Sequence, residues 1–173
     1  MERLGAVAKC APPLRKKCEQ DKLWTELLNG TVDIVASDHS PAPPEMKAGD
    51  FNRAWGGIAG VQSTLAVLLE CGHHERGLPL DRIGSLLSGR PASRFRIANK
   101  GRLIPGADAD LAIVDVSRSF DLSAENLMQR HRLSPYIGRR FRGAVERTIR
   151  RGETIVLNGK ITAQSRGALV RPS

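Results

Sequence analysis

The spacing of apolar residues along the chain predicts helices in its first hundred residues and strands after them. In the first part, apolar residues recur at the spacing of one face of an amphipathic helix. Asn29-Gly30 provides a helix stop, and Pro91 provides a helix start. The predicted helices are Asp21–Leu28, a segment carrying Val61, Leu65, Leu68 and Leu69, Leu80–Ser88, and Pro91–Phe95.

The pattern changes near Ala98–Gly101, after which apolar and polar residues alternate as in strands with one buried face. Arg151-Gly152 and Asn158-Gly159 are dipeptides that favour two-residue hairpin turns. The predicted strands are Asp110–Asp115, Val145–Ile149 and Thr154–Leu157. We therefore expect an α/β part over residues 1–99 and an antiparallel β part with a polar tail over residues 100–173.

One β-branched run, Thr31–Val35, predicts a buried strand that ends next to Asp38 and His39. If Leu4–Ala8 is the tail of an earlier strand, the helix between the two runs completes a βαβ unit with parallel strands. Catalytic groups in α/β barrels lie at such strand ends, so Asp38 and His39 are candidate site residues. The alternative is that Asp38 accepts hydrogen bonds from nearby amides in a turn.

A long proline-rich loop, Ser40–Asn52, and a glycine-rich helix entry, Trp55–Gly60, follow this run. Loops of this length in compact domains are usually functional. Gly56 and Gly57 permit close approach of the backbone, either to a ligand or only to a packed neighbour.

Charge and composition exclude some classes of function. The chain has 173 residues and a formal net charge of +9, which suits nucleic acid, an anionic membrane or an acidic partner. However, Lys and Arg are scattered, aromatic residues make up only 4% of the chain, and no nucleic-acid-binding motif is present. No apolar run is long enough to span a membrane. We therefore expect neither a nucleic acid nor a membrane as partner.

Cysteine and histidine spacing offers no ready metal site. Cys10, Cys18 and Cys71 form no CxxC pair, a pattern typical of a reducing compartment, so we expect a cytoplasmic protein without a secretory leader. The chain has 4 histidines, and none of them form HxH, HxxxH or HExxH pairs. The sequence by itself predicts no complete ligand set.

Four motifs in order resemble the C-terminal part of the cyclic amidohydrolases, the group of allantoinase, dihydroorotase and hydantoinase. The motifs are Lys9–Arg15, Ser37–Pro41, Trp55–Ile58 and Lys100–Leu111, and the region from Ser134 to Gly152 resembles the last segment of the family. Within the group, Cys10 and the loop Ser40–Lys47 are most similar to allantoinase.

The resemblance implies the C-terminal part of a metal-dependent (α/β)8 barrel, with strands 7 and 8 and the following helices in residues 1–99, and a small antiparallel β-sandwich portion in residues 100–173. It implies hydrolytic ring opening of a cyclic ureide such as allantoin, and a homo-oligomer in the intact family. Asp38 would bind the metal and accept a proton from the attacking water. His39, Cys10, Pro12, Gly56 and Gly57 would face the substrate.

The family's cofactor, a pair of zinc ions, is not expected to be retained by this chain. The HxH motif, the carboxylated lysine and two further histidines of the family would all precede Lys9, so that Asp38 is the one matching ligand. We interpret Met1 as lying near the seventh strand, in a truncated product, a split gene or a chain with a misassigned start. The alternative function is a non-catalytic module that complements a partner chain carrying the upstream strands, with association through exposed barrel edges.

Overall fold

The computed structural model describes residues 4–172, and its first long helix is α1, Lys17–Asn29. This helix confirms the one expected at Asp21–Leu28, but it begins four residues earlier. The side chain of Glu19 accepts a hydrogen bond from the Lys16 N–H (3.2 Å), which satisfies an unpaired donor at the helix start. Gly30 ends the helix in the left-handed region, with φ of 89°.

Two further helical runs follow. The first joins η3 (Val61–Ser63), α2 (Thr64–Val67) and the π-helical η4 (Leu68–His74). The second joins α3 (Leu80–Gly84), the π-helical η5 (Ser85–Gly89) and α4 (Arg90–Arg94). The two helices expected at Leu80–Ser88 and Pro91–Phe95 are therefore one continuous run.

Pro91 leaves one carbonyl of the second run free. In η5 the N–H of Arg90 bonds to Ser85 O, five residues back. The next bond of that pattern would join residue 91 to Leu86 O, but proline has no N–H. Val35 N–H donates to Leu86 O instead (3.3 Å), so the helix is tied to the chain segment before Asp38.

The second part of the chain forms an antiparallel sheet in the order β1-β2-β3-β4. Its strands are β1 (Leu111–Asp121), β2 (Arg140–Arg150), β3 (Glu153–Leu157) and β4 (Lys160–Ile161). Both expected hairpin turns are present: φ is 47° and 84° at Arg151 and Gly152, and 47° and 75° at Asn158 and Gly159. Positive φ at both central residues matches the twist of the flanking strands.

The expected strands before residue 100 are wrong. Leu4–Ala8 does not form a strand tail, because Gly5–Ala8 is the 3-10 helix η1. Thr31–Val35 does not form a strand, because no strand within residues 4–172 pairs with it. A hydrophobic run needs a neighbouring strand to form a ladder. No βαβ unit is therefore present in the described part of the chain, and the division into barrel and sandwich portions stays a prediction.

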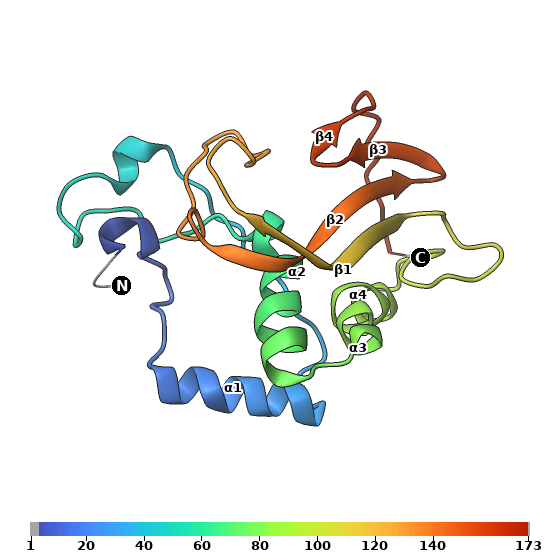
Figure 1. Cartoon of the computed structure of the whole chain (residues 1–173), viewed down its shortest axis with the longest axis horizontal. Coiled ribbons are helices and arrows are strands. Elements are labelled where there is room, and N and C mark those ends of the chain that lie inside the picture. The colour runs from blue at the N-terminus through green and yellow to red at the C-terminus, as the bar shows by residue number, and fades with distance from the viewer. Residues whose placement is uncertain (1–3, 173) are drawn as a thin grey trace.

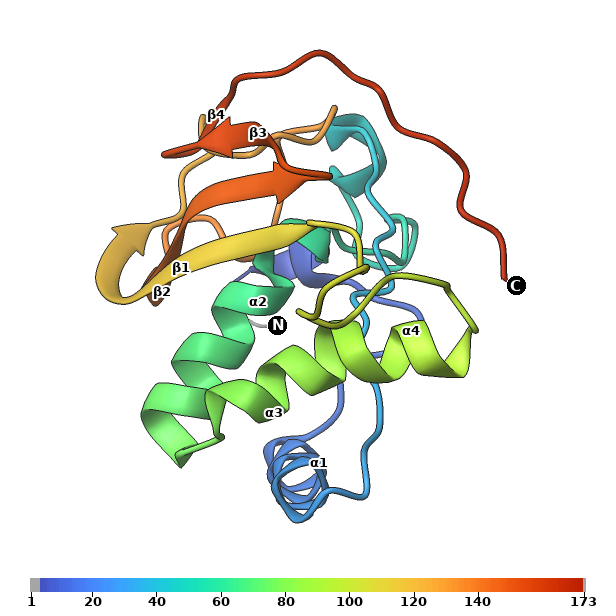
Figure 2. The ribbon, with the colours of Figure 1, turned by 90° about the vertical axis from the view of Figure 1, so that its right-hand side faces the viewer.

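The helices lie in layers beneath the sheet, with the α2 run next to the sheet and α1 farthest from it (Figures 1 and 2). Leu68 and Leu69 of this run contribute to a core shared with α1 and α3, while its Ala66 contributes to a second core beneath the sheet. The first core contains Leu27, Leu68, Leu69, Leu78, Ile83 and Leu86, and the second contains Ala66, Leu122, Leu127 and Phe141. None of the helices described is long and apolar enough to cross a membrane.

Candidate functional site

Three of the sequence motifs meet at Gly56 and Gly57. A Cβ atom on Gly57 would lie 2.8 Å from both Cβ and the carbonyl oxygen of Ser40, and one on Gly56 would lie 3.0 Å from Cβ of Ala11. The distances at Gly57 leave no room for a side chain, so glycine is required there, and the contact at Gly56 is tight. The glycine-rich helix entry therefore lies between the Lys9–Arg15 loop and the loop after Asp38.

Hydrogen bonds fix the same junction. Ser40 N–H donates to Ile58 O (3.0 Å). The Nδ1 atom of His39 accepts from the N–H groups of Gly60 (3.2 Å) and Val61 (3.3 Å), at the start of the α2 run. These amides have no partner inside the helix, and His39 supplies one. Because Nδ1 accepts, this ring carries its proton on Nε2.

Asp38 has an unusual backbone and a free carboxylate. Its φ is 43°, in the left-handed region that few residues other than glycine adopt, and its side chain is exposed. No hydrogen bond or ion pair within residues 4–172 involves its carboxylate. The alternative in which Asp38 accepts hydrogen bonds from turn amides is therefore not supported by the structure. Non-glycine residues in the left-handed region often lie at functional sites, so this backbone is consistent with a functional role for Asp38.

One helix face holds the segment that leads to Asp38. Arg82, Leu86 and Arg90 lie four residues apart and therefore share a face of the second helical run. Arg82 donates to Val32 O (3.4 Å), Leu86 O accepts from Val35 N–H, and Arg90 forms an ion pair with Asp33. These contacts replace, in part, the ladder that a neighbouring strand would supply.

The other predicted site residues, Cys10 and Pro12, lie on the Lys9–Arg15 loop. Cys10 is half-buried, and Pro12 is exposed and follows a cis peptide bond. The loop contacts the site through Ala11, which packs on Gly56. The structure therefore brings together the loops that carry all six predicted residues, Cys10, Pro12, Asp38, His39, Gly56 and Gly57.

Lys47 is a residue of this region that sequence reasoning missed. It is only 6% exposed, and its Nζ donates to Lys9 O (2.8 Å) and Ala6 O (3.3 Å). Burial lowers the pKa of Lys47, although the nearby Cys10 thiol opposes this shift. A lysine in a polar loop gives no sequence signal of burial, because lysines are almost always exposed.

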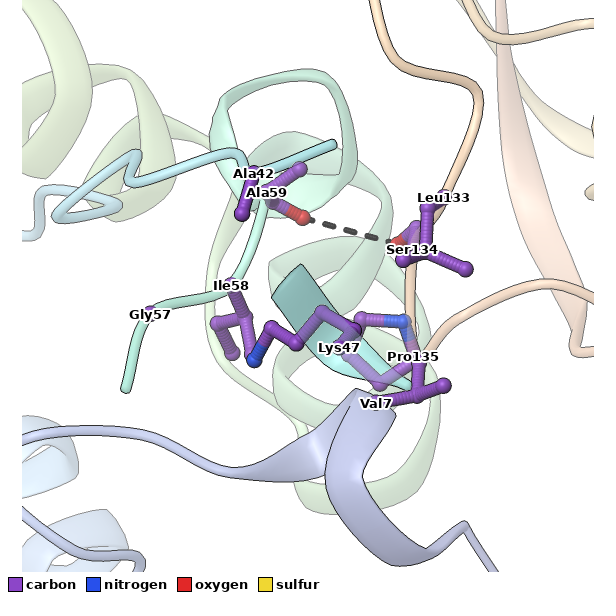
Figure 3. A pocket seen from close by; sticks show the side chains of 9 residues that line it. All are labelled: Val7, Ala42, Lys47, Gly57, Ile58, Ala59, Leu133, Ser134 and Pro135. Carbon is purple, nitrogen blue, oxygen red and sulfur yellow. Dashed lines mark hydrogen bonds between the residues drawn. The ribbon is translucent and has the colours of Figure 1, made fainter. Parts of the chain in front are cut away.

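Lys47 lines a small pocket beside the glycine-rich entry (Figure 3). Ser134, from the segment before β2, donates through Oγ to Ala59 O (3.5 Å) and closes one side. The lining residues are Val7, Ala42, Lys47, Gly57, Ile58, Ala59, Leu133, Ser134 and Pro135. The pocket therefore joins the glycine-rich entry to a segment near the sheet.

Metal ligands are sparse in the described part of the chain. No group of three or more His, Cys, Asp and Glu residues lies close enough together to hold a metal ion there. Asp38 is the one predicted ligand, and it belongs to no such group among the described residues.

Two solved structures that are similar to this chain are hydantoinases. The chain superimposes on the L-hydantoinase of Arthrobacter aurescens with a TM-score of 0.89 and 32% identity, over 94% of this chain and 37% of that one. It matches the D-hydantoinase of a Thermus species with a TM-score of 0.89 and 26% identity, over 96% and 38% of the two chains. The fold is thus that of a section of a cyclic amidohydrolase.

Three relatives with higher sequence identity to this chain are allantoinases. The chain is 58% identical to the allantoinase of Solibacter usitatus and 54% identical to that of Rubrobacter xylanophilus, in each case over 98% of its own length. It is 51% identical to the allantoinase of Deinococcus radiodurans over 99% of its length. The chain is therefore a homologue of allantoinase, and it spans 37–38% of the length of these relatives. No family model matches the chain.

Proposed function

We propose that this chain is the C-terminal section of an allantoinase and supplies Asp38 to the hydrolytic opening of the allantoin ring. The observation that carries the proposal is the free, exposed carboxylate of Asp38 at the junction of three motif loops. Identities of 51–58% to allantoinases support this substrate over other cyclic amides.

Asp38 would act as the general base. Hydrolysis of an amide needs a water that has lost a proton, and a carboxylate within hydrogen-bonding reach can accept that proton. No neighbouring donor competes for the Asp38 oxygens in the described residues. His39, already bonded to the helix start through Nδ1, would present its Nε2 side to the substrate, along with Cys10, Pro12 and the backbone of Gly56 and Gly57.

Zinc is the metal that the resemblance implies, but the described residues do not fit a zinc site by themselves. Catalytic zinc usually takes three protein ligands, and Asp38 would supply one. The remaining ligands would have to come from residues outside those described. The role proposed for Asp38 is therefore limited to its own proton transfer.

A second candidate function is a non-catalytic module that completes a partner chain. It is favoured by Thr31–Val35, whose backbone has no strand partner within residues 4–172 and could pair with a strand from elsewhere. Homo-oligomeric assembly and a cytoplasmic location stay predictions from the resemblance and the cysteine pattern.

The test is a hybrid enzyme in which this chain replaces the matching section of the Solibacter usitatus allantoinase. We expect the hybrid to open allantoin, and Asp38→Asn to reduce kcat by about 100-fold or more, because a neutral amide cannot take the proton. Asp81→Asn, an exposed aspartate on α3, is the matched control and should leave turnover unchanged.

A measurement of stability distinguishes a loss of catalysis from a loss of folding. In the chain alone, Asp38→Asn should change the free energy of unfolding by no more than about 0.5 kcal/mol, since no structural hydrogen bond is removed. Full turnover by the Asp38→Asn hybrid would overturn the assignment. A hybrid that folds but opens no allantoin would favour the non-catalytic module.

A further inference from the structure

Two lysines connect the loops on either side of the candidate site, and each donates to the backbone of the other's loop. Lys47, in η2 (Pro44–Lys47), donates through Nζ to Lys9 O (2.8 Å) and Ala6 O (3.3 Å). Lys9 donates through its own Nζ to Asn52 O (2.9 Å). The two side chains therefore cross between the Ala6–Cys10 segment and the long loop that follows Asp38.

The contact made by Lys47 is buried, unlike most contacts of lysine side chains. Its side chain lies beside Ile58, Val7 and Pro135 in the pocket, where little water reaches it (Figure 3). A buried ammonium group is costly unless its hydrogen bonds are made. Displacing the Lys9 and Ala6 carbonyls from Lys47 Nζ would therefore cost free energy, which holds these carbonyls in place. The Lys9 contact is more exposed and is supplemented by the Phe51 ring, 5.4 Å from Nζ.

The connected segments carry the residues assigned to substrate contact. Lys9, whose carbonyl Lys47 holds, directly precedes Cys10. Ala11 comes next and packs on Gly56. At the other end, Trp55 N–H donates to Met46 O (2.8 Å), which closes the long loop next to Lys47. Movement of either lysine contact would shift Cys10 relative to Gly56.

We propose that Lys9 and Lys47 form a cross-brace of positioning residues that sets the distance between the Cys10–Pro12 loop and the loop after Asp38. The role in catalysis rests on the function proposed above. The brace does not touch the reacting atoms. It fixes the shape of the substrate-facing surface, so its removal should weaken substrate binding more than the chemical step.

The first test needs no activity and uses the chain as it is. Hydrogen exchange measured by mass spectrometry should be about tenfold faster in Lys47→Met over the peptides that cover residues 5–12 and 44–55. Lys9→Met should increase the exchange rate in the same two regions to a smaller extent. It also tests the proposal if the Lys47 variant does not fold. Lys22→Met, on the exposed side of α1, is the matched control and should change neither region. Unchanged exchange in both variants would overturn the brace.

The second test uses the hybrid enzyme. Lys47→Met should raise KM for allantoin about tenfold, which corresponds to one lost charged hydrogen bond, and should change kcat by less than about twofold. Lys9→Arg keeps a charged donor and should retain most of the affinity that Lys9→Met loses. If Asp38→Asn removes turnover while Lys47→Met leaves KM unchanged, the brace is wrong and the proposed function stands. If the hybrid shows no turnover, the exchange experiment decides the brace alone.

Discussion

The sheet and the candidate site are built in opposite ways. In the sheet, each strand pairs with the strand next to it in the sequence, and two-residue turns join β2 to β3 and β3 to β4. Around the site, by contrast, Thr31–Val35 has no strand partner in the described residues, and side chains from distant segments hold the loops. The sheet is stabilised by backbone pairing between strands, whereas the loops of the site are held largely by side-chain contacts between distant segments.

The sheet and the site are connected through the α2 run. Glu70, on the α2 run, accepts hydrogen bonds from the Arg142 N–H and guanidinium on β2 (2.7–3.1 Å). Gly143 of β2 packs directly on Leu69 of the same run. Since this run begins at the amides bonded to His39, the sheet supports the site through one helix.

The largest effect is expected from Phe141→Ala, which removes the central side chain beneath the sheet. Phe141 is fully buried, in a cluster with Leu122, Leu127 and Ala66. A truncation of this kind lowers the free energy of unfolding by about 3–5 kcal/mol. Urea denaturation of the chain measures it, and Phe95→Ala, at a side chain that is 57% exposed, is the control. Equal small losses in both variants would mean that the sheet has no core of its own.

Gly143→Ala should have the next largest effect, about 2 kcal/mol or more. Its φ is 100°, and a Cβ would lie 3.0 Å from Cβ of Leu69, so the substitution meets both backbone strain and a steric clash. Gly138 has a similar φ of 82° but open space around it. Gly138→Ala therefore measures the backbone cost alone, and thermal unfolding of the two variants separates the terms. A loss at Gly138 that equals the loss at Gly143 would refute the clash with the helix.

A smaller, pH-dependent effect is expected at Glu70. The hydrogen bonds from Arg142 hold the pKa of Glu70 below its ordinary value of 4.5. The resulting stabilisation is fully present above the unfolded pKa and is lost as pH falls through the folded pKa. Unfolding at a series of pH values from 7 to about 2.5 should show the wild-type chain and Glu70→Gln converging as the carboxylate is protonated. A gap between wild type and Glu70→Gln that stays constant over this pH range would contradict the ion pair between Glu70 and Arg142.

The sheet was largely predictable because its signals are local. Asn158-Gly159 and Arg151-Gly152 specify their turns within two residues, and alternation identifies the strands around them. The strands are longer than expected, however: β1 extends to Asp121 rather than Asp115. Its register shifts near Ser119 interrupt simple alternation, so the sequence pattern hides the second half of the strand.

The site was predictable in its motifs but not in its geometry. The pattern identified the loops that carry Asp38, His39 and Gly57, and the structure brings these loops together. It failed at Thr31–Val35, since a hydrophobic run predicts burial but does not supply a partner strand. It also missed Lys47, whose Nζ donates to carbonyls 38 and 41 residues away along the chain.

Under the proposed function, this chain holds one reacting carboxylate of a metal-dependent site and not the site itself. Elemental analysis after dialysis tests it most directly, with the chain alone and the Solibacter usitatus hybrid prepared side by side. We expect well under one zinc per molecule in the chain alone and stoichiometric zinc in the hybrid, because catalytic zinc usually takes three protein ligands. One full equivalent of zinc that survives dialysis on the chain alone would contradict it.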